Sequence, residues 1–319
     1  MKACIDIGGT KVAASLSSGA GMELLGRRSE PTAKTGRNDA LALQVIRLVD
    51  EVCATAGIDP SAVQEAGVSS CGPFVLRDGL LEIAAPNICG GIAGPARGLP
   101  NDWMTALLEA PVRRRFSRVR IANDCVAALE AERRWGALKG FDHCAYVTWS
   151  TGIGVGLCVD GRVLHGKNGN AGHAGHMFVS DDDDALCGCG NVGDVEALVA
   201  GNAIERRFGA DAATLLQRAQ DGEAGAQARV AELCRLMGRA LYNLIATLDL
   251  QRISLGGGVF WNHRDYLLPR LQAQVAAHFP ALTAGCELVP AGLGHRVGDY
   301  AALALLADTA GAADLAANR

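Results

Sequence analysis

The sequence predicts an α/β protein of two similar lobes around a central cleft, each lobe following one βββαβαβα plan. Short apolar runs, which are typical of strands, alternate along the chain with longer stretches of helical spacing. The order of elements is completed once and begins again near residue 144, and each copy opens on a Gly-rich turn between two strands. The 319 residues are enough for two domains of about 150 residues each.

The first copy has three strands, then a helix, a strand, a helix, a strand and a helix. Its first helix is indicated by Leu41, Val45 and Leu48, which share one face at helical spacing. Asn123-Asp124 ends the last strand and can cap the helix that follows. The expected strands are Lys2–Ile7, Lys11–Ser17, Glu23–Glu30, Glu65–Ser69 and Val119–Ala122, and the expected helices are Asp39–Ala56, Asp102–Glu109 and Cys125–Arg134.

The second copy repeats this order with a long insertion. The segment His165–Asp194 has little regularity, and a loop of that length in a compact domain is usually functional. We expect an N-terminal lobe at 1–123, to which the C-terminal helix 297–319 returns, and a C-terminal lobe at 124–296 that includes the insertion 165–196. The expected strands are Cys144–Trp149, Val155–Val159, Arg162–Leu164, Arg252–Leu255 and Glu287–Val289, and the expected helices are Val195–Phe208, Ala224–Leu248, Tyr266–Ala277 and Val297–Ala307.

Composition and charge argue against several classes of protein. The net charge of −4 is unlike the basic footprint of a general nucleic-acid binder. No stretch approaches the ~18 apolar residues of a membrane span. Asp6 interrupts the N-terminal apolar run, where a signal peptide would be uniformly apolar. We therefore expect a cytoplasmic protein whose 11 cysteines are mostly reduced and buried.

Three Gly-rich turns follow strands at equivalent places and together indicate nucleotide binding. Glycines let backbone N–H groups approach a phosphate closely, and Thr10 and Lys11 add a hydroxyl and a charge. Taken singly, the first turn also suits an ordinary hairpin and the third a helix-entry loop. The first two turns are expected to hold a polyphosphate between them, and the third a base and ribose. The candidate residues are Asp6, Gly8, Gly9, Thr10 and Lys11, then Thr151 and Gly152, then Gly256, Gly257 and Gly258.

Asp124 is the candidate catalytic base. A carboxylate at the end of a buried strand can accept the proton of a sugar hydroxyl that attacks the γ-phosphate of ATP. Helix capping is the alternative role, and both roles can coexist. Charge on the phosphoryl group would be neutralised by Mg²⁺ and by the turn amides, with Asp6 as an outer-sphere partner of the Mg²⁺.

A metal site is indicated in the insertion. Cys187 and Cys189 are two residues apart, His176 lies nearby, and Asp194 can complete a tetrahedron. Histidine and cysteine suit Zn²⁺, and carboxylate is an acceptable fourth ligand. The sequence therefore predicts a structural zinc held by these four residues.

Together these residues resemble the ROK family (repressors, open reading frames and kinases) of the actin-like sugar kinase superfamily, over nearly the whole chain. Asp6–Lys11 and Ser150–Gly156 resemble its two phosphate motifs, Gly256–Gly258 its adenosine motif, and Asn123-Asp124 its catalytic Asn-Asp pair. The resemblance implies two ribonuclease-H-like (actin-like) lobes and an ATP- and Mg²⁺-dependent sugar kinase. We also expect a homo-oligomer, a dimer in the simplest case, with no nucleic-acid or membrane partner.

The same resemblance implies sugar contacts. Asn87 in Ala85-Pro86-Asn87 resembles a sugar-contacting asparagine, and Gly72-Pro73 resembles the adjoining sugar loop. Asn123 belongs to the catalytic pair and is expected to contact the sugar with Asp124. Glu196 matches the closing glutamate of the family's zinc motif and is implied to contact the sugar. His176 is implied to contact both sugar and metal.

The chain departs from the family pattern at two positions. His173 stands where the signature Glu-x-Gly-His has its glutamate, and a His-x-Gly-His form resembles bacterial N-acetylmannosamine kinases. Asp194 replaces the third cysteine of the zinc motif. The expected reaction is phosphorylation of the 6-hydroxyl of an aldohexose, with N-acetylmannosamine or another N-acetylhexosamine as the alternative substrate.

Two other classes of function were weighed. ROK repressors carry a helix-turn-helix domain before the first phosphate motif, whereas here that motif begins at residue 6, so we expect an enzyme. The presence of Asp124 also favours catalysis over an idle sugar or nucleotide sensor.

Overall fold

A computed structural model describes residues 1–19, 21–181 and 184–307 and divides the chain into two compact units. The first contains residues 1–127, 165–170 and those from 298 onward, and the second contains 128–164 and 171–297. The expected C-terminal helix lies outside the described residues from 308 on. None of the described helices is both long and apolar enough to cross a membrane.

The first unit is built on a five-stranded sheet of order β3-β2-β1-β4-β8. β1 pairs antiparallel with β2 and parallel with β4, which pairs parallel with β8. The strands are β1 Lys2–Ile7, β2 Lys11–Ser17, β3 Leu25–Pro31, β4 Glu65–Ser70 and β8 Arg118–Asn123, with a smaller sheet of β5 Phe74–Arg77, β6 Leu80–Ile83 and β7 Ala106–Leu107. The helices are α1 Ala40–Ala56, α2 Gly90–Ala93, α3 Glu109–Arg115, the start of α4 Asp124–Trp135, and α12 Val297–Leu306 from Gly298 on.

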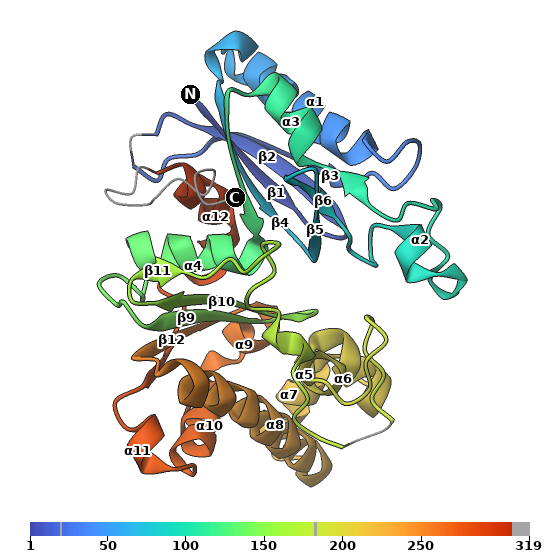
Figure 1. Cartoon of the computed structure of the whole chain (residues 1–319). Coiled ribbons are helices and arrows are strands. Elements are labelled where there is room, and N and C mark those ends of the chain that lie inside the picture. The colour runs from blue at the N-terminus through green and yellow to red at the C-terminus, as the bar shows by residue number, and fades with distance from the viewer. Residues whose placement is uncertain (20, 182–183, 308–319) are drawn as a thin grey trace. The chain divides into compact units, whose positions relative to one another are not determined.

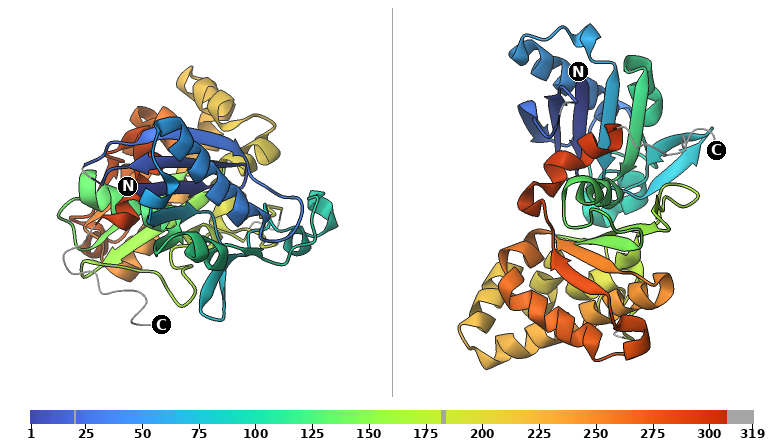
Figure 2. Two further views of the ribbon diagram at one scale, coloured as in Figure 1. Left: turned by 90° about the horizontal axis from the view of Figure 1, so that it is seen from above. Right: turned by 90° about the vertical axis from the view of Figure 1, so that its left-hand side faces the viewer.

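The first sheet is covered on both faces. α1 and α3 lie over one face (Figure 1), where Ala66 and Val68 of β4 join their core. Gly67 points to the other face, where a methyl group in its place would collide with the Ala302 carbonyl of α12 (Figure 2). A sheet buried on both sides exposes only its strand ends, so a ligand can reach parallel strands only there.

The second unit repeats this topology. Its sheet has the order β11-β10-β9-β12-β13, with β9 antiparallel to β10 and parallel to β12. The duplicated βββαβαβα plan is thereby confirmed. The strands are β9 Cys144–Trp149, β10 Ile153–Val159, β11 Arg162–Val163, β12 Arg252–Gly256 and β13 Glu287–Pro290, and the helices are α5 Val195–Val199, α6 Gly201–Phe208, α7 Ala212–Gln220, α8 Ala224–Leu248, α9 Gly258–Asn262, α10 Arg264–Ala276 and α11 Pro280–Thr283.

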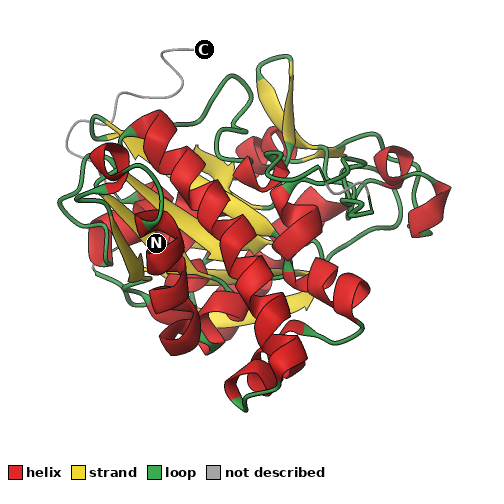
Figure 3. Ribbon diagram, turned by 90° about the horizontal axis from the view of Figure 1, so that it is seen from below, coloured by secondary structure: helices red, strands yellow, loops and turns green. Residues whose placement is uncertain are grey.

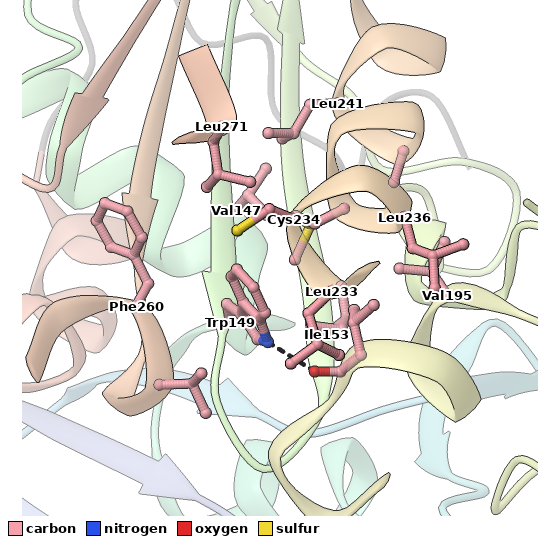
Figure 4. Packing of buried hydrophobic residues seen from close by; sticks show 14 of the residues in the cluster. Val147, Trp149, Ile153, Val195, Leu233, Cys234, Leu236, Leu241, Phe260 and Leu271 are labelled. Carbon is pink, nitrogen blue, oxygen red and sulfur yellow. Dashed lines mark hydrogen bonds between the residues drawn. The ribbon is translucent and has the colours of Figure 1, made fainter. Parts of the chain in front are cut away.

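A helical layer covers the second sheet, and the long helix α8 packs against α10 within it (Figure 3). The core beneath it contains Trp149, Phe260 and Leu271 (Figure 4). The indole Nε1 of Trp149 donates a 2.7 Å hydrogen bond to the Val199 carbonyl, which satisfies the ring's only polar atom. Trp149 ends β9, so this packing fixes the start of the Gly-rich turn that follows.

Glu132 of α4 joins three segments of the second unit. Its side chain is fully buried and lies at the carboxyl side of β12 and β13. The carboxylate accepts hydrogen bonds from the backbone N–H groups of Ala137, Gly292 and Leu293 at 2.8–2.9 Å and from the Ser254 hydroxyl at 3.1 Å. These four donors connect α4 to the segment that follows it, to β12 and to the loop after β13.

Two local predictions are wrong. Asp102–Glu109 is not a helix, because Ala106–Leu107 pairs antiparallel with β6 and a helix begins only at Glu109. The predicted helix Val195–Phe208 is broken at Ala200, whose extended backbone (ψ 154°) separates α5 from α6. In both cases tertiary contacts override local propensity.

Candidate active site and metal cluster

The candidate residues fall into one set on each unit. The first unit carries Asp6, Gly8, Gly9, Thr10, Lys11, Gly72, Asn87, Asn123 and Asp124. The second carries Thr151, Gly152, His173, His176, Cys187, Cys189, Asp194, Glu196, Gly256, Gly257 and Gly258.

Two carboxylates lie at the carboxyl ends of parallel strands in the first unit. Asp6 is near the end of β1, and Asp124 follows β8 directly. Burial raises the pKa of Asp6 to about 6, and the negative charge of Asp124 adds to the rise, while Arg27 and Lys11 oppose it. The two carboxylates therefore interact electrostatically, and a paired acidic site of this kind suits a divalent cation.

The Asn123-Asp124 pair caps α4. The Cys125 N–H donates to Asn123 Oδ1 at 3.0 Å and to Asp124 Oδ1 at 2.8 Å. The capping role of Asp124 is thus real as local structure. Because a carboxylate has two oxygens, the cap fixes the orientation of the side chain and is compatible with the second role.

The β1–β2 turn is closed by hydrogen bonds on both sides. The Gly8 N–H donates to the Lys11 carbonyl at 2.9 Å, and the Thr32 hydroxyl donates to the Gly8 carbonyl at 2.7 Å. Neither Gly8 nor Gly9 has a positive φ. Backbone conformation therefore does not require glycine at either position; close approach requires it at Gly9, where a methyl group would lie 2.7 Å from Asn87 Cγ, whereas at Gly8 it would meet only the Lys11 carbonyl at 3.3 Å.

The loop that carries Asn87 depends on a residue that the sequence reasoning missed. Asn101 Oδ1 accepts the Gly90 and Trp103 N–H groups at 2.8 and 3.1 Å, and its Nδ2 donates to the Lys34 and Ile88 carbonyls at 2.9 and 3.0 Å. Four hydrogen bonds of one amide fix the segment that directly follows Asn87 to Lys34 and to the Asn101–Trp103 segment. An isolated asparagine in a loop gives no sequence signal of such a role.

The loop after Gly72 has a similar anchor. Asn170 accepts the Phe74 N–H and donates to the Phe74 carbonyl, both at 2.7 Å. Asn170 thus pairs with β5 as a neighbouring strand would. Its segment 165–170 belongs to the first unit, although the sequence around it continues into the second.

The β9–β10 turn of the second unit contacts Glu196 of α5. The Ile153 N–H donates to Glu196 Oε2 at 2.9 Å, and the Ser150 carbonyl accepts the Gly201 N–H at 2.8 Å. The start of α6 and the middle of α5 therefore hold this turn from one side. Thr151 at its tip is exposed.

The third glycine run is shaped mainly by packing. Gly257 has φ +86°, and a methyl group there would lie 2.6 Å from Thr148 Oγ1. A methyl group on Gly256 would lie 2.5 Å from the Tyr146 hydroxyl. Gly258, the first residue of α9, has nothing closer than 3.8 Å. Two of the three glycines are thus explained by their contact with β9, which supports the helix-entry reading for them.

The histidine segment lies along β10. The Val155 N–H donates to the Gly172 carbonyl at 3.1 Å, and Gly175 is buried against Ile153. The rings of His173 and His176 are stacked, with centroids 6.2 Å apart. The glycines of this segment therefore let its backbone approach β10 and present the two rings together.

The four candidate metal ligands lie together. One ligand atom from each of His176, Cys187, Cys189 and Asp194 lies within 4.8 Å of the other three. His176 Nδ1 is 3.0 Å from Asp194 Oδ2, and the Cys187 and Cys189 sulfurs are 3.7 and 3.5 Å from the same nitrogen. Cys189 Sγ is 3.6 Å from Asp194 Oδ2. Ligands of a tetrahedral zinc are roughly 3.4–3.8 Å apart, so this donor set fits the ion.

The electrostatics of the cluster also suit a cation. Burial opposes ionisation of Asp194, but hydrogen bonds from His176 and the Ala197 N–H outweigh it and hold the pKa of Asp194 below its usual value. The hydrogen bond to Asp194 raises the pKa of His176. Burial raises the pKa of the Cys187 thiol, so a bound cation would have to displace its proton.

Comparison with known proteins decides the family. The model of the ROK family matches residues 2–309. The chain belongs to the ROK family. A crystal structure of a ROK hexokinase from Thermus thermophilus matches with a TM-score of 0.73 at 30% identity, over 95% of this chain and 96% of that one. The actin-like two-lobe fold of ROK kinases is therefore the fold of this protein.

Two curated relatives of this ROK protein differ in the sugar that their names carry. A glucokinase from Aeropyrum pernix is 29% identical over 326 residues, covering 94% of this chain and 95% of that protein. An N-acetylmannosamine kinase from Escherichia coli is 34% identical over 261 residues, covering 80% and 82%. Family membership alone thus does not choose the sugar.

Proposed function

We propose that this ROK protein is an ATP-dependent kinase that phosphorylates the 6-hydroxyl of an aldohexose. The observation that carries the proposal is Asp124, whose carboxylate directly follows β8, the edge strand of the first sheet, and interacts electrostatically with Asp6 near the end of β1, with β4 between the two strands. This is the edge at which open parallel sheets bind ligands. The kinase names of the curated relatives support it.

Asp124 accepts the proton of the 6-hydroxyl as that oxygen forms its bond to the γ-phosphorus. The bond from phosphorus to the β–γ bridging oxygen breaks, and ADP leaves with the electron pair. The residues proposed to orient the sugar are Asn87, Asn123, the Gly72 loop, His173, His176 and Glu196. Lys11, Thr10 and the N–H groups of the two glycine turns bind phosphate oxygens.

Magnesium is implied by this reaction. It is carried by ATP and supplies positive charge to the phosphate oxygens when bound. Asp6 would hold it through a water molecule; burial and the charge of Asp124 raise the pKa of Asp6, and the positive charge of the ion would favour its ionised form. A structural zinc on His176, Cys187, Cys189 and Asp194 completes the proposed cofactors, and its role is to fix the insertion that carries His173 and Glu196.

N-acetylmannosamine is a second candidate substrate. His173 stands where glucose-specific members have a glutamate, and the 34% identical relative is an N-acetylmannosamine kinase. Imidazole has less acceptor capacity than a carboxylate, so a pocket with His173 gains less from two adjacent sugar hydroxyls. This favours a sugar that carries a substituent at the part of the ring that faces His173.

The test is a coupled ADP-release assay with ATP, Mg²⁺ and a panel of glucose, mannose, fructose, N-acetylglucosamine and N-acetylmannosamine. Asp124→Asn should lower kcat at least about 100-fold, since general-base catalysis contributes roughly 10²–10⁴-fold. Asp265→Asn makes the same change on a carboxylate with 93% exposure and should leave kcat unchanged. Near-normal turnover of Asp124→Asn would contradict the assignment. The 6-deoxy analogue of the best sugar should not be phosphorylated.

The two other classes have their own outcomes. A sugar-responsive repressor would give sequence-specific DNA binding in a gel-shift assay and no sugar-dependent ADP release. An idle sensor would bind sugar or ATP without turnover. Either result would replace the kinase proposal.

A further inference from the structure

We propose that a sugar-contacting side chain packs against one glycine of each phosphate turn, so that sugar binding and the position of the turn are coupled within each unit. The amide of Asn87 packs against Gly9 in the first unit, and the carboxylate of Glu196 packs against Gly152 in the second. The inference rests on the proposed function. It adds that these two glycines are needed for the sugar as well as for phosphate.

Gly9 leaves room for the amide of Asn87. A methyl group in place of its hydrogen would lie 2.7 Å from Asn87 Cγ and closer still to Nδ2. Real Cβ atoms essentially never approach a neighbour within 3.0 Å, so an alanine here has to displace the amide. Because Gly9 has no positive φ, backbone conformation gives no other reason for glycine at this position.

Asn87 is placed for a ligand. Its side chain is exposed, and its amide forms no hydrogen bond with any residue in the described part of the chain. The residues that directly follow it, Ile88 and Gly90, are fixed through Asn101. The Asn87 amide is therefore held between a fixed loop and the Gly9 backbone, with its polar atoms available to a sugar hydroxyl.

The second unit has the same arrangement with a carboxylate. A methyl group on Gly152 would lie 2.7 Å from Glu196 Oε2, the oxygen that accepts the Ile153 N–H. Glu196 is placed by α5, whose first turn is capped by Asp194 through a 2.7 Å hydrogen bond from the Ala197 N–H. Gly152 also has no positive φ. A direct hydrogen bond thus links the side chain expected to bind sugar to the turn expected to bind phosphate.

Coupling follows from these contacts. A sugar that orders Asn87 and Glu196 also orders the surfaces against which Gly9 and Gly152 pack, so less ordering remains when a nucleotide binds. By linkage, the nucleotide tightens sugar binding by the same factor. Couplings of this kind are typically about 5–150-fold in affinity.

The first test is calorimetric binding of a sugar that the wild type phosphorylates, with no nucleotide present. Gly9→Ala and Gly152→Ala should each weaken sugar binding at least about fivefold, although neither glycine is itself expected to contact the sugar. The matched controls are Gly298→Ala in α12, whose methyl group would meet nothing within 4 Å, and Gly225→Ala in α8, whose methyl group would meet only Glu223 Oε1 at 3.8 Å; both positions are exposed, and Gly8→Ala is made beside them as a measure of disruption of the turn. Both controls should retain the wild-type Kd for sugar. Thermal melts check that each variant is folded.

The second test removes the sugar-contacting side chains themselves. The Kd of a non-hydrolysable ATP analogue is measured with and without saturating sugar. The ratio of the two Kd values should be at least about fivefold for the wild type, smaller for Asn87→Ala, and close to one when Asn87→Ala is combined with Glu196→Ala. Gly9→Ala added to Asn87→Ala should weaken sugar binding no further, because the displaced side chain is already gone.

The outcomes separate this inference from the proposed function. A wild type that binds none of the sugars overturns the proposed function and this inference with it. A wild type that binds and phosphorylates a sugar, with an unchanged sugar Kd in Gly9→Ala and Gly152→Ala, overturns the coupling alone. Equal weakening by Gly8→Ala and Gly9→Ala indicates general disruption of the turn and also overturns it.

Discussion

Replacing Asp6 by asparagine separates the cost of a buried charge from its use in the proposed reaction. Burial and the charge of Asp124 raise the pKa of Asp6 from 3.8 to about 6, with Arg27 and Lys11 opposing. At neutral pH the carboxylate is ionised in surroundings that disfavour its charge. Asparagine keeps the shape and removes the charge, so it should stabilise the protein when Mg²⁺ is absent.

The magnitude follows from the shift. A rise from 3.8 to about 6 is worth about 3 kcal/mol at 1.36 kcal/mol per pKa unit. Asp6 is only partly buried, so screening by solvent reduces the expected gain to roughly 1–2 kcal/mol. Because the pKa of Asp6 is raised in the folded protein, the contribution of this carboxyl group to folding stability is fully present below about pH 3.8 and is lost as the pH rises through about 6. The variant should therefore gain most above pH 6 and little at pH 4.

The assay is thermal unfolding of the wild type and Asp6→Asn at pH 4 and pH 7.5 in buffer with a chelator. At pH 7.5 the variant should melt about 2–6 °C higher, and at pH 4 the difference should nearly vanish. With ATP and Mg²⁺ its kcat should fall about 10–100-fold, as expected when a group in the outer shell of a metal is lost. Asp265→Asn is the control for the charge change. A variant that melts lower than the wild type at pH 7.5 would refute the reasoning.

Substitutions at three further positions test other parts of the structure. Glu132→Gln puts an NH₂ group against a backbone N–H in a fully buried site and should destabilise the second unit by about 2–4 kcal/mol in urea unfolding; a loss below about 1 kcal/mol would show that the site adapts. Asp194→Asn keeps a capping oxygen but weakens the ligand, whereas Asp194→Cys keeps a ligand but removes the cap. Zinc content by mass spectrometry should fall about 10-fold or more in Asp194→Asn and persist in Asp194→Cys. After chelation, Asp194→Cys should have the lower melting temperature of the two, because it has lost the helix cap. Equal zinc in both variants, or no zinc in the wild type, would remove Asp194 as a ligand. His173→Glu should raise the ratio of kcat/KM for glucose over N-acetylmannosamine about tenfold, and an unchanged ratio would place selectivity elsewhere.

Local sequence patterns predicted most of the two main sheets. Lys2–Ile7, Lys11–Ser17 and Cys144–Trp149 are strands with the expected bounds, and Ala224–Leu248 is a helix as expected. Each is a run of uniform period ended by a glycine or polar turn, and such signals are local. The small sheet β5-β6-β7 was missed because its pairing depends on distant contacts, among them a hydrogen bond from Thr105 to the buried Glu82.

The candidate site was predictable where one segment carries its chemistry. Cys187 and Cys189 with Asp194 are close in sequence, and the expected metal cluster does lie together in space. The supports were not predictable, because Asn101 and Asn170 act through backbone contacts with segments far away in the chain. An asparagine in a loop has the same local sequence signal whether it holds a loop in place or faces solvent.

Glycine shows this limit of sequence-based prediction most clearly, because it has no side chain whose chemistry would indicate why it is needed. Gly257 is required by its φ of +86° and by contact with β9, whereas Gly9 and Gly152 have ordinary backbone angles and are required by one approaching side chain each. From sequence, Gly9 and Gly152 appeared as members of phosphate turns and Gly257 as a member of the adenosine-binding run. If phosphate approach were their only reason, replacing Gly9 or Gly152 would affect ATP and leave sugar binding intact. The contacts with Asn87 and Glu196 lead to the opposite expectation, since each glycine has a second neighbour that belongs to the sugar.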